Sequence, residues 1–361
     1  MKSARLFPNE FKILFIILFL LLLIGFLGQY SAFDGQWRGQ LERHIIRMIV
    51  GVIVMFGICA IDFKFWNNFA YAFYMFVFAS LVIVDLLGIV KLGAQRWMDL
   101  YFFTFQPSEL MKLTLILALA RYYSMLSSTE ALEFKFHVFP IFLMMLPTIL
   151  ILRQPDLGTA GLLIGVGASM IFLSGFPLKI FITFVISCIT LCPFGWFFLH
   201  DYQKNRILTF FNPDRDPLGI GYHILQSKIA IGSGHIWGRG FLQGTQSKLN
   251  FLPEKNTDFI FTTIAEEFGF AGTLLVILLF LAICYFFFWV ASESRAKFAK
   301  LMCYGLGVLM FLHVFVNIAM VTGLLPIVGI PLPFLSYGGS SMITFMISCS
   351  LVVSTLRQSK H

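Results

Sequence analysis

The stretch Phe251-Leu-Pro-Glu-Lys-Asn-Thr-Asp258-Phe-Ile-Phe261 leads from a polar loop into an apolar run that continues to residue 291. A helix needs about 20 apolar residues to cross the hydrocarbon core of a bilayer, and this run is long enough. Nine more such runs lie near residues 11–28, 45–61, 68–90, 107–125, 136–152, 157–174, 177–199, 298–323 and 339–356. The polar alternation of β-barrel strands is missing. We therefore predict an all-α polytopic membrane protein, with residues 1–361 forming one integral membrane domain of about ten transmembrane helices.

The composition excludes an ordinary soluble protein, because 58% of the residues are hydrophobic and only 12% are charged. The excess of basic residues indicates membrane topology rather than nucleic-acid binding. If the N-terminus is cytoplasmic, short inner segments hold about twelve Lys and Arg residues against six in short outer segments. We therefore expect both termini to be cytoplasmic. The six cysteines lack the spacing of a zinc site or a disulfide framework.

The connection between predicted spans 7 and 8, at about residues 200–258, is much longer than the others and is expected to be extracytoplasmic. Within it, Tyr222-His-Ile-Leu-Gln-Ser-Lys-Ile-Ala-Ile231 has apolar residues at helical spacing, which predicts an interfacial amphipathic helix. Five glycines between positions 232 and 244 then predict a tightly folded segment against the membrane surface.

Ionisable residues inside membrane spans are candidates for function, because burying them without a partner is unfavourable. Glu109 and Lys112 are three residues apart, so they share one helix face and can pair. They either neutralise each other within the bundle or line a polar cavity. Arg96 and Trp97 offer a cation and an aromatic ring at an outer edge, where they suit phosphate and sugar.

Three other positions allow both a structural and a functional interpretation. Asp156, after Pro155, is suited to cap a helix, and Arg153 can anchor at the interface or bind phosphate. Asp258 can likewise be a helix cap or a catalytic carboxylate. Gly338-Gly-Ser-Ser341 opens the last span after a segment with several prolines, and its small residues suit either helix packing or an anion.

Five short segments, in this order, resemble the SEDS family of bacterial cell-wall polymerases (shape, elongation, division and sporulation proteins). They are Gly93-Ala-Gln-Arg-Trp97, Gln106-Pro-Ser-Glu109, Arg153-Gln-Pro-Asp-Leu-Gly-Thr159, Phe251-Leu-Pro-Glu254 with Thr257-Asp-Phe-Ile-Phe261, and Pro331-Leu-Pro-Phe-Leu-Ser-Tyr-Gly-Gly-Ser-Ser341. Residues 221–234 and 244–254 are more similar to the elongation members than to the division members. One residue departs from the pattern: Asn256 stands where the family usually has His, and Asn does not titrate near neutral pH.

The resemblance implies a peptidoglycan glycosyltransferase that polymerises lipid II into β-1,4-linked glycan strands during cell elongation, at the outer face of the bacterial inner (cytoplasmic) membrane. It implies that Asp258 is the base of an inverting reaction. Cations then stabilise the leaving diphosphate, with or without a divalent metal ion such as Mg²⁺ or Mn²⁺. The expected substrate and diphosphate ligands are Arg96, Trp97, Lys112, Arg153, Arg206, Ser340 and Ser341, beside a cavity charge network of Glu109, Lys112 and Asp156.

The expected partners are lipid II, membrane lipids and a class B penicillin-binding protein, and an apolar groove between spans is expected to hold the polyprenyl tail. Two other functions stay open at this point. A lipid II flippase would also use intramembrane charges and broken helices. A non-enzymatic scaffold for cell-wall synthases would tolerate replacement of Asp258.

Overall fold

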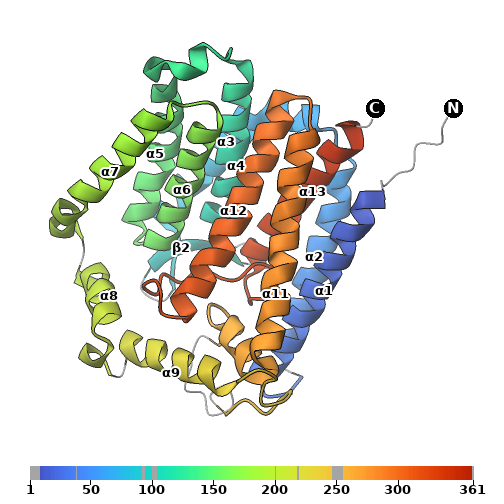
Figure 1. Cartoon of the computed structure of the whole chain (residues 1–361), viewed down its shortest axis with the longest axis vertical. Coiled ribbons are helices and arrows are strands. Elements are labelled where there is room, and N and C mark those ends of the chain that lie inside the picture. Colours follow the sequence, from blue (N-terminus) through green and yellow to red (C-terminus); the bar gives the residue numbers. More distant parts are fainter. Residues whose placement is uncertain are drawn as a thin grey trace.

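The computed structural model describes residues 9–37, 39–91, 94–99, 104–199, 201–217, 219–245 and 255–359, which form a helical bundle (Figure 1). Its α-helices are α1 (Asn9–Ala32), α2 (Gly39–Cys59), α3 (Phe63–Leu87), α4 (Pro107–Met125), α5 (Val138–Arg153), α6 (Leu157–Leu173), α7 (Leu178–Gly195), α8 (Asp201–Phe211), α9 (Ile220–Ser233), α11 (Ile260–Glu293), α12 (Lys297–Val321) and α13 (Gly339–Ser359). Short 3₁₀ helices lie at Glu130–Leu132, Phe134–His137, Trp196–Phe198 and Pro213–Arg215.

Six helical segments within the described residues are long and apolar enough to cross a membrane. These segments are Glu10–Ala32, Phe63–Leu87, Phe134–Arg153, Ile260–Glu293, Lys297–Val321 and Gly339–Arg357. The other four predicted spans fall on α2, α4, α6 and α7, and their crossing of the membrane stays a prediction. The chain is thus a multi-pass membrane protein, and the count of ten is its expected topology.

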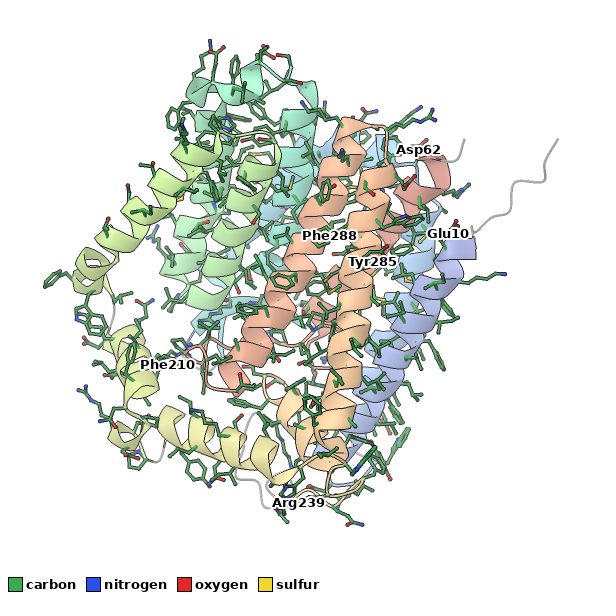
Figure 2. All side chains as sticks on the ribbon, in the orientation of Figure 1. Glu10, Asp62, Phe210, Arg239, Tyr285 and Phe288 are labelled. Atoms are coloured by element: carbon green, nitrogen blue, oxygen red, sulfur yellow. The ribbon has the colours of Figure 1, made fainter. Side chains whose placement is uncertain are left out.

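Apolar side chains on the outside of the bundle are widely exposed, whereas several charged and amide side chains lie inside it. Phe76 of α3 and Tyr285 of α11 are each 72% exposed, and Tyr285 is labelled beside α11 in Figure 2. Lys112 and Asn317, by contrast, are fully buried. This distribution is expected for a surface that faces lipid around a polar interior.

A small antiparallel sheet between α3 and α4 was not predicted and makes the fold mostly, rather than entirely, helical. Its strands are β1 (Ile89–Lys91), β2 (Ala94–Asp99) and β3 (Thr104–Phe105), hydrogen-bonded in the order β1-β2-β3. Strands of two to six residues carry too little alternation to be recognised in a sequence dominated by long apolar runs. The sheet matters for function because β2 carries Arg96 and Trp97.

The described part of the long connection after α7 is folded, as expected. The predicted helix at Tyr222–Ile231 is confirmed as α9, which lies across one end of the bundle, with α8 leading to it from the side of α7 (Figure 1). The start of α1 and the end of α13 lie at the opposite end. The predicted tight glycine segment is also confirmed, because a Cβ atom at Gly234 or Gly238 would collide with a carbonyl oxygen of α11.

The predicted span at 260–291 corresponds to α11, which is kinked, because two helical pieces meet at Gly269. Gly269 has φ 65° and ψ −161°, which a residue with a side chain rarely adopts. The N–H groups of Phe270 and Ala271 donate to carbonyls of residues 235 and 236, at 2.9 and 3.0 Å. A straight helix of 34 residues would be about 50 Å long, well beyond the hydrocarbon core. The short piece therefore carries the chain from Asp258 to the membrane-spanning piece.

Candidate active site

Several of the residues expected to act together lie near one irregular segment, Leu324–Gly338, which joins α12 to α13 and which we name the C-terminal strap. Its backbone is not helical, and two of its residues have positive φ angles: Gly329 with φ 73° and Phe334 with φ 64°. Non-helical backbone at membrane depth is tolerated where it is buried in protein or lines a wet cavity. The strap therefore provides backbone carbonyls that side chains from several helices can hold.

Asp258 lies against the strap. It belongs to a turn at residues 255–259, which we name the aspartate loop. The residue that caps α11 is Phe259, so Asp258 lies one residue before the cap position. A Cβ atom at Gly329 would be 3.3 Å from Oδ2 of Asp258, so the carboxylate packs against the side of the strap that glycine leaves open. The amide of Asn317 donates to the carbonyl oxygen of Asp258 at 2.9 Å.

Arg206 also contacts the strap from α8. Its Nη1 donates to the carbonyl oxygen of Ile327 at 3.2 Å, two residues before Gly329. No sequence pattern around Arg206 predicts this contact. The structure brings it to the same short segment as Asp258.

Arg96 and Asp156 form a second group, close to the strap. The guanidinium of Arg96 lies 3.5 Å from Oδ2 of Asp156 and donates to the carbonyls of Gln154 and Pro155. The predicted helix cap at Asp156 is confirmed, because its Oδ1 accepts from the N–H of Thr159 at 3.1 Å. The start of α6 packs against the strap, since a Cβ atom at Gly158 would be 3.0 Å from the carbonyl oxygen of residue 328.

Trp97 and Arg153 lie beside this second group. Trp97 is half-buried in β2, opposite Ile89 of β1. Arg153 is exposed at the last position of α5, directly before the carbonyls that Arg96 holds. Arg153 is therefore accessible to a ligand, whereas Arg96 is already engaged by the protein.

The predicted pair of Glu109 and Lys112 is confirmed and has a third member. Nζ of Lys112 lies 2.7 Å from Oε1 of Glu109 and 2.6 Å from Nε2 of His313 on α12. Nδ1 of His313 lies 3.3 Å from the carbonyl oxygen of Pro331 in the strap. One neutral tautomer satisfies both contacts, with Nε2 accepting from Lys112 and Nδ1–H donating to Pro331. The charge network thus reaches the strap through His313.

Ser340 and Ser341 lie in the first turn of α13, next to the first turn of α4. The backbone N–H of Gln106 donates to Oγ of Ser340 at 3.1 Å. The Oγ atoms of Ser341 and Ser108 are buried and have no hydrogen-bond partner among the described residues. Arg47 of α2 lies over the ring of Tyr337, 4.5 Å from its centre, and next to Gly339, the first residue of α13.

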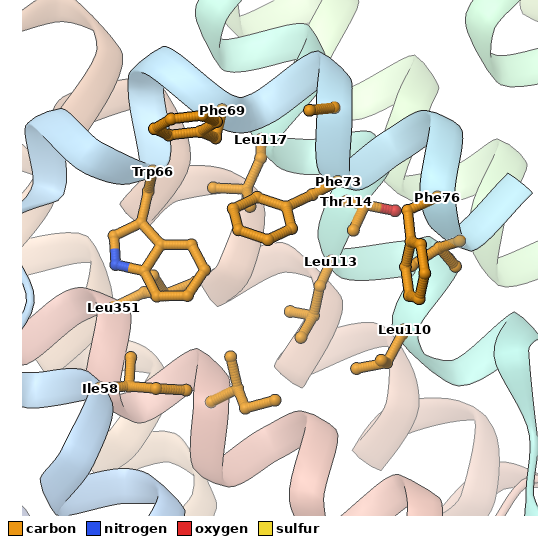
Figure 3. A pocket seen from close by; sticks show the side chains of 13 residues that line it. Ile58, Trp66, Phe69, Phe73, Phe76, Leu110, Leu113, Thr114, Leu117 and Leu351 are labelled. Atoms are coloured by element: carbon orange, nitrogen blue, oxygen red, sulfur yellow. The ribbon is translucent and has the colours of Figure 1, made fainter.

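An apolar crevice of about 560 Å³ runs between α3 and α4, with α2 and α13 below (Figure 3). Trp66, Phe69, Phe73 and Phe76 of α3 face Leu110, Leu113 and Leu117 of α4, and Ile58, Ile347 and Leu351 complete the lining with others. Leu110 is in the first turn of α4, two residues after Ser108. The crevice therefore ends beside the two helix N-termini.

Four residues of this region were missed by sequence reasoning: Gln29, Arg47, His313 and Asn317. His313 and Asn317 could have been found, because they are polar residues four apart in an apolar run and therefore share a helix face. Gln29 and Arg47 lie near the ends of their runs, where polar residues are common. Among the described residues, no group of three or more His, Cys, Asp or Glu side chains is arranged to hold a metal ion.

The comparisons with known proteins identify the class. Residues 11–361 match the model of the FtsW/RodA/SpoVE family, described as cell cycle protein. The chain is 42% identical over 340 residues to the peptidoglycan glycosyltransferase MrdB of Escherichia coli K12, covering 94% of this chain and 91% of that protein. This chain belongs to the FtsW/RodA/SpoVE family, and the resemblance drawn from its five segments is confirmed.

Two solved structures share the fold of the chain. One, from a peptidoglycan synthase complex that coordinates polymerization and crosslinking, superposes with a TM-score of 0.84 at 27% identity, covering 96% of this chain and 97% of that one. The other, the rod shape determining protein RodA of Thermus thermophilus, gives a TM-score of 0.72 at 23% identity, with coverage of 96% and 97%, and shows the shared fold. The chain therefore shares the fold of RodA.

Proposed function

We propose that this protein is a peptidoglycan glycosyltransferase that polymerises lipid II into β-1,4-linked glycan strands during cell elongation. The observation that carries the proposal is the position of Asp258. Its carboxylate packs at the open side of Gly329, in a strap that Arg206 also holds. Family membership and the name of the Escherichia coli relative support the same activity.

We assign to Asp258 the role of general base. The acceptor sugar's 4-hydroxyl attacks the anomeric carbon of the lipid-linked donor, and the carboxylate removes its proton as the new bond forms. An α-linked diphosphate that yields a β-1,4 link requires inversion, so a single displacement with one base is sufficient. The leaving diphosphate takes the bonding electrons, and nearby cations stabilise its charge. Asn256 lies in the same loop and cannot supply a second titrating base.

We place the polyprenyl tail in the crevice between α3 and α4, because a crevice of about 560 Å³ lined almost wholly by apolar side chains suits a hydrocarbon chain. A tail in that position would bring its diphosphate to the first turns of α4 and α13. Helix N-termini attract anions, and Arg47 stands beside one of them.

The surroundings of Arg47 support this placement. A cation at the positive end of a helix is unfavourable. No carboxylate among the described residues pairs with Arg47. An anion bound between Arg47 and α13 would neutralise both, with Ser340 and Ser341 as further ligands. Arg206 and Arg153 remain candidate ligands for the diphosphate of the second lipid-linked sugar in the reaction.

A divalent cation such as Mg²⁺ or Mn²⁺ stays part of the hypothesis. Mg²⁺ in phosphate-handling sites is usually bound by one or two carboxylates together with substrate oxygens. Such a shared site needs no cluster of three protein ligands, and Asp258 is the carboxylate that would contribute. Polymerisation measured with EDTA, and then with added Mg²⁺ or Mn²⁺, tests this requirement.

We further propose that the protein lies in the bacterial inner membrane, that both termini are cytoplasmic, and that the active face and the 200–258 connection are extracytoplasmic. The placement of α9 at one end of the bundle, opposite the start of α1 and the end of α13, is consistent with this topology. A class B penicillin-binding protein is the proposed partner, in line with the synthase complex among the structural relatives.

The test is polymerisation of purified lipid II by the wild-type protein together with its penicillin-binding partner. Glycan strands sensitive to a muramidase would support the polymerase. Transfer of labelled lipid II across liposomes without polymer would favour the flippase instead. If neither activity appears in a folded complex, the scaffold is the remaining interpretation.

A further inference from the structure

Two buried carboxamides join the aspartate loop to the C-terminal strap. Nε2 of Gln29, on α1, donates to the carbonyl oxygen of Asn256 at 2.7 Å and to that of Leu335 at 2.9 Å. Nδ2 of Asn317, on α12, donates to the carbonyl oxygen of Asp258 at 2.9 Å and to that of Ile330 at 2.6 Å. Each amide group thus donates hydrogen bonds to one carbonyl of the loop and to one carbonyl of the strap.

The chemistry of these contacts fixes which way each amide faces. Carbonyl oxygens only accept hydrogen bonds, so the NH₂ group and not the amide oxygen must point at them. The oxygen atoms Oε1 of Gln29 and Oδ1 of Asn317 are buried and have no partner among the described residues. Both residues are fully buried. Among the described residues, each side chain therefore hydrogen-bonds only as a donor to its two carbonyls.

The two amides differ in whether another hydrogen bond joins the loop to the strap at the same loop carbonyl. The carbonyl of Asn256 also accepts from the backbone N–H of Tyr337 at 2.8 Å, which itself joins the loop to the strap. Asn317 holds the carbonyl of Asp258 itself. Four residues before it on the same face of α12, His313 contacts the carbonyl of Pro331, the residue after Ile330. Helix α12 therefore fixes the strap at two consecutive carbonyls and the loop at the catalytic residue.

We propose that Asn317 is a positioning residue for Asp258, and that Gln29 reinforces it from the other end of the loop. The inference rests on the proposed role of Asp258 as the base. Neither the loop nor the strap has regular secondary structure at these carbonyls. The two amides connect them to the long helices α1 and α12, and so set the distance between the carboxylate and the reacting hydroxyl.

The experiment is a cycle of variants in the lipid II polymerisation assay with the partner protein present. Asn317→Ala is expected to lower kcat about 10- to 100-fold, because a displacement near 1 Å costs about that much. The KM for lipid II is expected to stay within about 2-fold, since the residue acts through the base. Gln29→Ala is expected to have a smaller effect, because Tyr337 still holds Asn256.

Tyr74→Phe is the matched control, because the Tyr74 hydroxyl is likewise buried and donates to a distant carbonyl, that of Leu143, at 2.7 Å. It should retain kcat within about 2-fold. The readout that separates positioning from stability is non-additivity. On an Asp258→Asn background, Asn317→Ala should lower the residual rate no further than about 2-fold.

Two results would overturn the inference: wild-type kcat in a folded Asn317→Ala protein, or an equal loss of rate with and without the Asp258 carboxylate. If Asn317→Ala does not fold, Asn317→Gln keeps both donors but displaces them, and it should show the same fall in kcat. Failure of the proposed function is separate, because it would appear as an inactive wild-type complex or as full activity of Asp258→Asn.

Discussion

Replacing Lys112 by methionine removes the cation that two buried groups share. Methionine is similar in length and volume to the lysine stem, so packing in α4 is largely kept. The carboxylate of Glu109, only 4% exposed, would lose its partner at 2.7 Å, and Nε2 of His313 would lose a donor at 2.6 Å. The variant therefore measures how much the buried charge of Lys112 contributes to the free energy of unfolding.

The expected loss follows from these contacts. Removing one partner of a buried ion pair costs about 3–5 kcal/mol of stability, because the other charge is left uncompensated. Adding Glu109→Gln to Lys112→Met removes that stranded charge. What remains is mainly the unsatisfied Nε2 of His313, which costs about 1–3 kcal/mol. The double variant should therefore be more stable than the single one.

The assay is reversible unfolding in mixed micelles, comparing the single and double variants with a surface control. Lys135 and Glu133 form a pair with the same 2.7 Å separation, but their side chains are 68% and 53% exposed. Lys135→Met should change stability by less than about 1 kcal/mol. The reasoning is refuted if Lys112→Met also costs less than about 1 kcal/mol, or if the double variant is the less stable of the two.

Three further predictions concern the substrate. Gly329→Ala should lower kcat about 10-fold in steady-state polymerisation, because φ 73° disfavours alanine and its Cβ would lie 3.3 Å from Oδ2 of Asp258; a wild-type kcat would contradict this. Ala72→Trp, which fills the crevice, should raise the KM for lipid II more than the KM for a short-chain analogue, whereas the outward-facing Leu86→Trp should not. Arg47→Gln should weaken lipid II binding at least 10-fold in a direct binding assay, since a charged hydrogen bond to a phosphate contributes about 1.5–3 kcal/mol; unchanged affinity would exclude Arg47 from the diphosphate site.

The sequence predicted most of the helices, because long apolar runs allow few alternatives in a membrane protein. It also predicted the Glu109–Lys112 pair and the Asp156 cap, since both are local contacts within about one helical turn. The kink at Gly269 was missed. A single glycine in an apolar run is compatible with a continuous helix, and the contacts that hold the kink come from residues 235–240.

The assembly of the site could not be predicted, because its contacts join residues far apart in the chain. Gln29 contacts Asn256 across 227 positions, and Lys112 contacts His313 across 201. No local pattern encodes such distances. The carbonyl oxygens that Gln29, Arg206 and Asn317 hold are backbone atoms, which every residue carries, so side-chain chemistry alone does not mark them.

The central claim is that the carboxylate of Asp258 is the base for glycan polymerisation. The measurement is lipid II polymerisation by the purified complex carrying Asp258→Asn, which keeps the shape of the side chain and removes its basicity. Asp62→Asn, at the opposite end of the bundle from α9 (Figure 2), is the control for the loss of one carboxylate. We predict that Asp258→Asn folds, binds its partner and loses polymerisation by at least about 100-fold, while Asp62→Asn stays active. Polymerisation by Asp258→Asn at the wild-type rate would contradict the account.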